Sequence, residues 1–555
     1  MSLMIKTILF YLECIPTNSR FLKLPSIQSI TSSLANVAQT AICNTLLPFS
    51  TNPPVFVGPN EGQDLAVLTY GNSSRVIKLR GTQTGGRVMI MEGQILIGEG
   101  PPIHIHTRED ESFHVLEGEL EFQVGETIIK AKAGQWIYAP IGIKHTFRNV
   151  NSTNARLEFV FTPAGIENYF EEIKKMLSCF LLAINSIRVA IPLISLFGSA
   201  PTFFILWFVL RLITFIFCPH YIYRRCDDYL YSFYQKFVLF FFENWVNCKI
   251  YFHGDYQEII KKKENVLFIS NHQSSVDWII ANMLAVRQGS LGHIRYILKT
   301  ELKWIPLYGF YFQQHGCIYV RRNDKGDLER VEKGIRQIKS NGLPVWLVIF
   351  PEGTRYNPVK SQDVIQRSRQ FAKQKDVPPF DHVLYPRTGA TIAAINALKD
   401  KFDAVYDVTI MYSQTYDKNQ QMRIAAASMG EFLQGQTKEL HIHIKRIPID
   451  LIPSATNEQI SNWLYQRFII KDKLLKNFYD QNRNNKYLLD IDSNREGIQA
   501  ELHLTDTIFS CIFFLLTTCL LLITPQGRSL YWQICLFGPP ISLLWMHIFP
   551  QKNFI

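Results

Sequence analysis

The stretch "VLFISNHQSSVDW", residues 266–278, decides how the middle of this chain folds. Its first five residues form an apolar run of the length of one strand buried on both faces. His272 and Asp277 follow that run directly, five residues apart. A histidine whose second ring nitrogen is held by a carboxylate is fixed in one tautomer and strengthened as a general base. The stretch therefore predicts a buried strand that ends at a histidine–carboxylate pair.

The surrounding residues, from about 265 to 450, alternate between strand and helix patterns. Residues 344–350, "PVWLVIF", form the next buried strand, and 404–412 and 439–447 are later ones. Residues 327–342 have a helical period, and one face carries Leu328, Val331, Ile335 and Ile338. Asp327 suits the N-cap of this helix, and Asn341–Gly342 suits its C-terminal end. This alternation predicts an α/β domain.

The absence of several known motifs limits the reactions that the His272–Asp277 pair is expected to catalyse. It contains no G-x-S-x-G elbow, no G-x-x-x-x-G-K-[ST] phosphate loop and no H-E-x-x-H zinc motif. A base without an enzyme nucleophile suits attack by a substrate hydroxyl on an acyl group that is already activated, such as the thioester of acyl-CoA. An isolated His-x4-Asp pattern is also compatible with a capped helix start, so the neighbouring motifs have to decide.

Four ordered motifs carry a family resemblance. "NHQSSVDW" contains N-H-x4-D, and "GCIYVRR" (316–322), "FPEGTR" (350–355) and "LYPRTGAT" (384–391) follow it. Together they resemble the glycerolipid acyltransferases, and the stretch 291–322 looks most like the epsilon-type 1-acylglycerol-3-phosphate acyltransferases. The resemblance extends from about residue 185 to 550. It implies acyl-CoA and a lysophospholipid as substrates, with His272 as general base and Asp277 as its orienting partner.

The same resemblance implies which residues hold the glycerol and phosphate of the acceptor. These are Arg322, Glu352, Gly353 and Arg355. A guanidinium can bind phosphate in bidentate fashion, and a glycine allows close approach of the backbone. The chain departs from many relatives at residues 321–322, where two arginines stand in place of an acid and an arginine. Which arginine binds the phosphate therefore stays open.

A second constellation lies far upstream, in "HIHTREDE" at residues 104–111. His104 and His106 share one face of a strand, Glu111 follows, and His145 lies on a later strand. Three imidazoles and one carboxylate predict a site for a first-row metal. A lone His-x-His is usually only a strand face, and His441 and His443 fit that reading because no glutamate or third histidine stands at useful spacing. His114 is expected to be an ordinary strand residue.

The full spacing of this region resembles both motifs of the cupin family. The first is G-x5-H-x-H-x4-E-x6-G from Gly98 to Gly118, and the second is G-x5-P-x-G-x2-H-x3-N from Gly134 to Asn149. The resemblance implies a small β-barrel with a divalent ion (Mn, Fe, Zn or Ni) at His104, His106, Glu111 and His145. Short strand patterns separated by Gly, Pro or Asn across residues 65–165 agree with an all-β domain.

Composition indicates contact with a membrane. Hydrophobic residues make up 47% of the 555 residues and charged residues only 19%, with a net charge of +11. Three uncharged segments, 189–210, 507–527 and 529–549, approach the ~20 residues that span a bilayer. Pro192, Gly198 and Pro201 weaken the first as a straight helix. The positive charge favours anionic lipid head groups, because no nucleic-acid reader motif occurs.

The sequence thus predicts a multidomain chain with seven segments. They are a poorly ordered N-terminus (1–60), a cupin β-barrel (61–165), a linker helix (166–188), a transmembrane or membrane-embedded segment (189–218), an acyltransferase domain (219–480), a linker (481–506) and a transmembrane hairpin (507–549). An integral membrane protein of the endoplasmic reticulum or mitochondria is expected. A natural fusion and two merged neighbouring genes give the same sequence, with Met176 near the start of the second protein in the latter case.

The predicted function is transfer of a fatty acyl chain from CoA to the sn-2 hydroxyl of lysophosphatidic acid. Two alternatives stay open. One is remodelling of another lysophospholipid such as lysocardiolipin, and the other is a membrane-anchored, metal-dependent cupin enzyme or sensor. Replacing His272 distinguishes the first two from the last, because only an acyltransferase depends on that base.

Overall fold

The computed structural model describes residues 53–58, 61–65, 75–321, 327–340, 342–375, 377–417, 422–481 and 497–548. The predicted N-terminal segment 1–60 therefore lies outside the described residues except for 53–58, and so do Arg322 and Asn341. The described chain divides into two compact units, with the division between Asn185 and Ser186. Each unit is described by itself.

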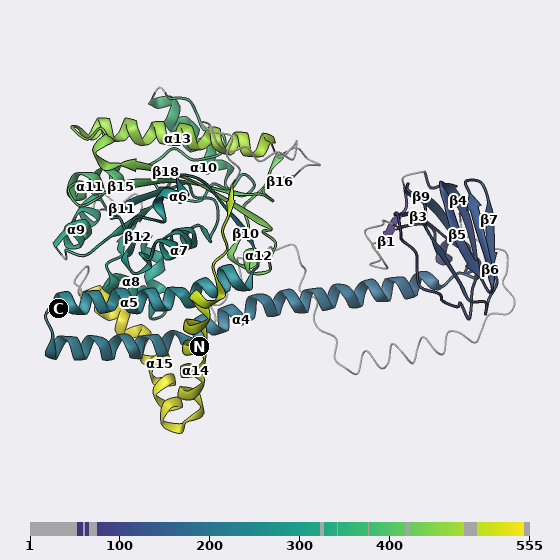
Figure 1. Cartoon of the computed structure of the whole chain (residues 1–555), viewed down its shortest axis with the longest axis horizontal. Helices are drawn as coiled ribbons and strands as arrows, with labels where there is room; N and C mark the ends of the chain where they lie inside the picture. The colour runs from purple at the N-terminus through teal and green to yellow at the C-terminus, as the bar shows by residue number, and fades with distance from the viewer. Residues whose placement is uncertain are drawn as a thin grey trace. The chain divides into compact units, whose positions relative to one another are not determined.

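The first unit is built of two antiparallel sheets that share one core. One sheet has the strand order β1-β2-β3-β9-β4-β7, and the other has the order β6-β5-β8 (Figure 1). Alternate residues point inward along several of these strands, as in β9, where every second side chain is buried. Phe113, Phe122, Phe147 and Phe159 fill the space between the sheets. The expected all-β cupin region is therefore a β-sheet domain, as its alternating pattern predicts.

The elements of the first unit are short, as the sequence pattern indicates. They are β1 (Gln63–Leu65), β2 (Arg75–Leu79), the helical turn α3 (Gly81–Thr84), β3 (Met89–Ile95), β4 (Asp110–Glu117), β5 (Glu119–Val124), β6 (Thr127–Lys132), β7 (Trp136–Ala139), β8 (His145–Arg148) and β9 (Ala155–Thr162).

The second unit is organised around an eight-stranded sheet of order β13-β12-β14-β11-β15-β18-β10-β19. The first five strands are parallel, β18 runs antiparallel to β15, and β10 is parallel to β18. The strands are β10 (Lys249–Gly254), β11 (Val266–Ser270), β12 (Ile294–Lys299), β13 (Ile318–Val320), β14 (Trp346–Ile349), β15 (Ala404–Tyr412), β18 (Glu439–Pro448) and β19 (Ile498–Gln499).

Helices cover both faces of this sheet, which explains why β11 is buried throughout and apolar from Val266 to Ile269. Val266 and Phe268 belong to the core on one face, and Leu267 and Ile269 belong to the core on the other. Figure 1 shows α7 and α5 on one side of the sheet and α13, α11 and α9 on the other. Successive side chains of a strand that is buried on both faces enter two apolar environments in turn, so a continuous apolar run is favoured.

The helices of this unit include one that corrects a sequence expectation. In α9 (Asp327–Ser340), Val331, Ile335 and Ile338 are buried as predicted, but Leu328 is 48% exposed. Leu328 lies in the first turn, ahead of the residues that meet the sheet, and Asp327 is already helical. The other helices are α5 (His220–Leu239), α6 (Tyr256–Ile259), α7 (Asp277–Gln288), α8 (Tyr308–His315), α10 (Gln362–Gln374), α11 (Gly389–Leu398), α12 (Met429–Leu433) and α13 (Asn457–Gln481).

The predicted linker helix and first membrane segment form one continuous helix, α4 (Ile166–Phe217), which contains Pro192 and Pro201. Prolines are tolerated in such a helix where neighbouring groups satisfy the backbone that they disturb. Five residues before Pro201, the carbonyl of Leu196 accepts hydrogen bonds from the hydroxyls of Tyr234 (3.1 Å) and Tyr308 (2.6 Å), which join this part of α4 to α5 and α8. These tyrosines lie far along the sequence, so the sequence pattern could not include their effect.

Two helices in the described part of the chain, α4 and α14 (Leu504–Ile523), are long and apolar enough to cross a membrane by length and composition. The third predicted segment is α15 (Pro525–Ile548), which follows α14 after one residue and contains Pro539 and Pro540. The two helices α14 and α15 pack on one another. Length and composition are also met by core helices of soluble proteins, so membrane insertion is argued below from the whole molecule.

Candidate functional site

Two of the four motifs meet because they follow neighbouring parallel strands. His272 comes two residues after β11, and the FPEGTR motif begins directly after β14. The next strand, β15, ends at Tyr412, which belongs to no motif. The strands β14, β11 and β15 are adjacent and parallel, so their carboxyl ends lie at one edge of the sheet. Crevices outside such an edge are where ligands bind in α/β proteins.

Asp277 holds the imidazole of His272. Its Oδ2 lies 2.8 Å from His272 Nδ1 and also accepts the backbone N–H groups of Gln273 (2.5 Å) and Ser274 (2.8 Å). Asp277 is fully buried at the start of α7, whereas the His272 side chain is 18% exposed. The bond at Nδ1 fixes the tautomer of the ring and directs Nε2 away from Asp277. The predicted pair is therefore formed, with the histidine on the side that solvent reaches.

Glu352 connects this pair to the third and fourth motifs. Its Oε1 accepts the backbone N–H of His272 (2.7 Å), and its Oε2 accepts that of Leu384 (2.8 Å). Burial raises the pKa of Glu352 to about 8, although the two backbone amides act in the opposite direction. Both oxygens are thus occupied within the protein, and the carboxyl joins three loops at the end of the sheet.

Gly353 and Arg355, two further predicted acceptor residues, lie in the same turn. Gly353 has φ +70°, and a Cβ there would lie 3.1 Å from the side chain of Arg387. Only glycine adopts this conformation without strain. The side chain of Arg355 is exposed. Arg322 lies outside the described residues, and its neighbour Arg321, at the end of β13, is exposed.

Sequence reasoning missed three side chains of this site. The hydroxyl of Tyr412 donates to Asp277 Oδ1 (2.5 Å). Arg423 donates to the side chain of Gln273 and to the carbonyl of His382 (2.9 Å). Gln273 stands inside the N-H-x4-D motif, which could have drawn attention to it. Tyr412 and Arg423 belong to no motif, and only the fold brings them close.

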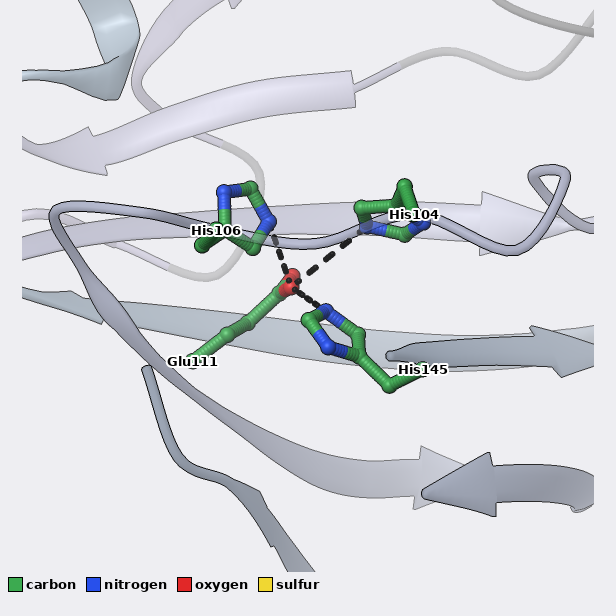
Figure 2. A group of neighbouring side chains, drawn as sticks. All are labelled: His104, His106, Glu111 and His145. Atoms are coloured by element: carbon green, nitrogen blue, oxygen red, sulfur yellow. Dashed lines mark hydrogen bonds and ion pairs between the residues drawn. The ribbon is translucent and has the colours of Figure 1, made fainter. Parts of the chain in front are cut away.

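The upstream residues also converge. Figure 2 shows the imidazoles of His104, His106 and His145 around the carboxylate of Glu111. Glu111 Oε2 lies 2.9 Å from His145 Nε2, 3.1 Å from His106 Nε2 and 3.9 Å from His104 Nε2. Strand pairing produces this arrangement, because residues 104 and 145 form a bridge between their backbones.

The donor set fits a divalent metal ion. One ligand atom from each residue lies within 4.8 Å of the others, as ligands at about 2.0–2.2 Å from a common ion require. The Nδ1 atoms of His104 and His145 each lie 2.9 Å from a backbone carbonyl, so each Nε2 has its lone pair toward the centre. Burial lowers the pKa of His145, but the bond to Glu111 outweighs it and the pKa is raised.

The other histidines of interest have structural roles. His114 Nδ1 lies 3.1 Å from Glu158, and its ring stacks on Trp136. His441 lies in β18, buried beside His253 at 3.1 Å, and burial lowers its pKa to about 4. The expectation that His441 is structural agrees with this packing.

Comparison with known proteins matches both units. The acyltransferase family matches residues 249–413, its C-terminal family matches 431–500, and the cupin domain family matches 92–162. The 1-acyl-sn-glycerol-3-phosphate acyltransferase epsilon of Mus musculus is 41% identical over 376 residues, which cover 67% of this chain and 100% of that protein. The chain belongs to the 1-acylglycerol-3-phosphate acyltransferase family.

Two further members extend the comparison. A probable 1-acyl-sn-glycerol-3-phosphate acyltransferase 5 of Arabidopsis thaliana is 31% identical over 60% of this chain and 82% of its own length. Lysocardiolipin acyltransferase 1 of Mus musculus is 29% identical over 40% of this chain and 56% of its own length. This acyltransferase therefore carries an N-terminal cupin domain in addition to the residues that match these relatives.

Proposed function

We propose that this acyltransferase moves a fatty acyl chain from acyl-CoA to the sn-2 hydroxyl of 1-acylglycerol-3-phosphate, which yields phosphatidic acid. The observation that carries this proposal is the pair His272–Asp277, bonded at 2.8 Å at the sheet edge where the other motifs gather. The mouse relative matched over its whole length bears the name of this reaction.

In the proposed step, Nε2 of His272 removes the proton from the sn-2 hydroxyl as its oxygen attacks the thioester carbonyl. The C–S bond then breaks, and the imidazolium returns the proton to the sulfur of CoA as it leaves. Asp277 holds Nδ1–H and stabilises the imidazolium through its charge. The ester bond replaces the thioester bond, so no external reductant, oxidant or nucleophile is needed.

The glycerol phosphate of the acceptor is proposed to bind at Arg355, Arg322 and Gly353. The exposed guanidinium of Arg355 and the turn at Gly353 lie in the segment that follows β14. A phosphate monoester accepts two parallel N–H bonds from a guanidinium. Glu352 contributes to this acceptor site by holding the surrounding backbone in place, because both its oxygens already accept backbone amides.

Lysocardiolipin or another lysophospholipid is the second candidate acceptor, favoured by the resemblance to the mouse lysocardiolipin acyltransferase. The two acceptors differ in the esterification of the phosphate. A phosphate monoester carries more charge than a diester. The chain offers basic side chains at Arg321 after β13, at Arg355 after β14 and at Arg387 before α11. This local charge favours the monoester.

We further propose that the enzyme is embedded in the membrane of the endoplasmic reticulum or the mitochondria. Residues 189–217 of α4 and the helices α14 and α15 would form its membrane part. Their outward-facing residues are large and apolar, for example Phe215, Phe509 and Leu536, each more than 60% exposed. Apolar surface of this extent is stable against lipid and unfavourable in water.

The cupin domain is proposed to bind one divalent ion (Mn, Fe, Zn or Ni) at His104, His106, Glu111 and His145. When bound, such an ion acts as a Lewis acid toward a donor atom of a ligand. The alternative that the cupin is the main enzymatic activity of the chain predicts that loss of His272 has no consequence for turnover.

The decisive experiment measures CoA release by purified full-length protein over a panel of lysophospholipids. We expect the highest kcat/KM with lysophosphatidic acid. A higher kcat/KM with monolysocardiolipin would replace the first acceptor by the second. Absence of transfer to every lysophospholipid in the panel would contradict the function.

A further inference from the structure

The cupin domain contains a buried arginine, Arg75, that is not a member of the metal cluster. Arg75 is the first residue of β2, and only 9% of it is exposed. It lies on the same face of β2 as Ile77, which belongs to the core between the two sheets. Its guanidinium carbon lies 5.1 Å from the centre of the Phe159 ring, so the charged end of the side chain is inside the domain.

Within the described residues, the side chain of Arg75 makes neither a hydrogen bond nor an ion pair. Its guanidinium lies over the ring of Phe159. A guanidinium has five N–H donors, and burying them without acceptors costs free energy. Two carboxylates act on Arg75 from a distance, Glu99 and Glu111, and yet burial lowers the pKa of Arg75. One oxygen of Glu99 is already bonded to the backbone N–H of Leu96 at 2.8 Å. No nitrogen of Arg75 is among the fully enclosed side-chain atoms that lack a partner, so its donors stay within reach of solvent and can meet an acceptor that enters from there.

Arg75 and the metal cluster share one interior. Phe159 contacts Phe113 at 5.8 Å between ring centres, and Phe113 contacts His145 at 6.1 Å. Glu111 is at once a member of the cluster and a charge that acts on Arg75. The cluster is also open on one side, because the side chains of His104 and His106 are 33% and 15% exposed. A small molecule from solvent can thus approach the cluster from that side.

The sum of the charges around Arg75, with a divalent ion bound, favours binding of an anion. Arg75, Glu99 and Glu111 together carry one negative charge, and a divalent ion on the cluster changes that to one positive charge. A buried positive charge is stabilised by a partner of opposite sign. A carboxylate carries one negative charge and accepts two parallel N–H bonds from a guanidinium.

We propose that the cupin domain binds a small organic acid, with a carboxylate of that ligand on the guanidinium of Arg75. This site is separate from the acyltransferase site and does not depend on the function proposed for it. The chain would then combine lipid acylation with recognition of a water-soluble acid.

The test uses full-length, Mn²⁺-loaded protein and calorimetric titration with malonate, which is a small dicarboxylate. Malonamide, which has the same shape without charge, is the matched ligand control. We expect saturable binding of malonate, a Kd at least tenfold higher in Arg75→Gln, and an unchanged Kd in Arg87→Gln. A tenfold change corresponds to about 1.4 kcal/mol. Arg87 is an exposed arginine of the same domain, so it controls for the loss of one positive charge.

Further variants keep the result interpretable. His272→Ala should leave malonate binding unchanged, since that residue belongs to the other unit. Arg75→Lys keeps the positive charge but cannot donate two parallel N–H bonds, so an intermediate Kd is expected. Thermal unfolding and metal content of each variant report whether it is folded and loaded. A folded, loaded Arg75→Gln protein that binds malonate like the wild type would overturn the proposal, as would equal binding of malonamide, no saturable binding of malonate, or tighter binding of inorganic phosphate than of malonate.

Discussion

The hydroxyl of Tyr412 donates a 2.5 Å hydrogen bond to Oδ1 of Asp277, the oxygen that His272 does not use. The two residues are 135 positions apart, at the end of β15 and the start of α7. Burial, together with the charge of Asp277, raises the pKa of Tyr412, so its hydroxyl stays a donor. Asp277 is therefore held from both sides, and the orientation of the His272 imidazole depends on a tyrosine that belongs to no motif.

Removing that hydroxyl is expected to slow acyl transfer. Tyr412→Phe should lower kcat about tenfold with little change in KM, because a hydrogen bond to a charged group contributes about 1.5–3 kcal/mol and part of that reaches the transition state. Tyr465→Phe is the matched control, since its hydroxyl donates to the carbonyl of Pro378 in a buried position away from the pair. Equal kinetics for the two variants would show that Tyr412 does not position Asp277.

Glu352 provides a prediction for pH. Its pKa rises from 4.5 when unfolded to about 8 in the folded protein, mainly through burial. The folded state then keeps a proton that the unfolded state loses, so this residue lowers stability progressively as pH rises from about 4.5 to about 8. Glu352→Gln cannot ionise. Its melting temperature relative to the wild type should therefore increase between pH 5 and pH 8.

Glu264→Gln is the matched control for this measurement. The pKa of Glu264 is lowered: burial alone would raise it, but the bonds from Arg446 and Tyr406 outweigh burial. Its stabilising contribution is present above the unfolded pKa and is lost only as pH falls through the folded pKa. The difference between this variant and the wild type should stay constant from pH 5 to pH 8. A flat difference for Glu352→Gln as well would mean that Glu352 is ionised at neutral pH.

Two glycines with the same backbone conformation separate strain from function. Gly353 has φ +70° next to Arg387, and Gly342 has φ +67° with no heavy atom within 4 Å of a built Cβ. Gly353→Ala and Gly342→Ala should each lose about 1–2 kcal/mol of stability from the left-handed conformation. Only Gly353→Ala should also lower kcat/KM for lysophosphatidic acid, because its turn lies in the proposed acceptor site. Similar losses of kcat/KM in both variants would assign the effect to stability.

The metal cluster and the acyl transfer site are expected to work independently. The double variant His104→Ala, His106→Ala should lose its divalent ion in metal analysis of the full-length protein. Its rate of acyl transfer should stay within about threefold of the wild type, a change of roughly 0.6 kcal/mol. His114→Ala should keep the ion, because His114 is bonded to Glu158 instead. A folded double variant without acyl transfer would require a regulatory link between the units.

The sequence was sufficient to predict elements whose signal is local. The apolar run before His272, the helix around Ile335 and the alternating strands of the cupin region all appear in the structure. The clusters His272–Asp277 and His104–His106–Glu111–His145 form as their spacing predicts.

What the sequence did not predict depends on contacts between distant residues. Tyr412 reaches the site because β15 pairs with β11, and Arg423 of β17 (Met422–Arg423) reaches it by its hydrogen bond to Gln273. The helix α4 continues through Pro192 and Pro201, near which Tyr234 and Tyr308 donate to the Leu196 carbonyl. The exposure of Leu328 follows from where α9 meets the sheet, which a helical period alone does not give.

The central claim is that His272 is the base for transfer of an acyl chain to lysophosphatidic acid. Its most direct test compares CoA release, dependent on lysophosphatidic acid, by purified wild type, His272→Ala and His503→Ala, the last an exposed histidine outside the site. Loss of a general base predicts that the rate falls by about 10²-fold or more in His272→Ala and is unchanged in His503→Ala. A folded His272→Ala protein that transfers the acyl chain at the wild-type rate would contradict the claim.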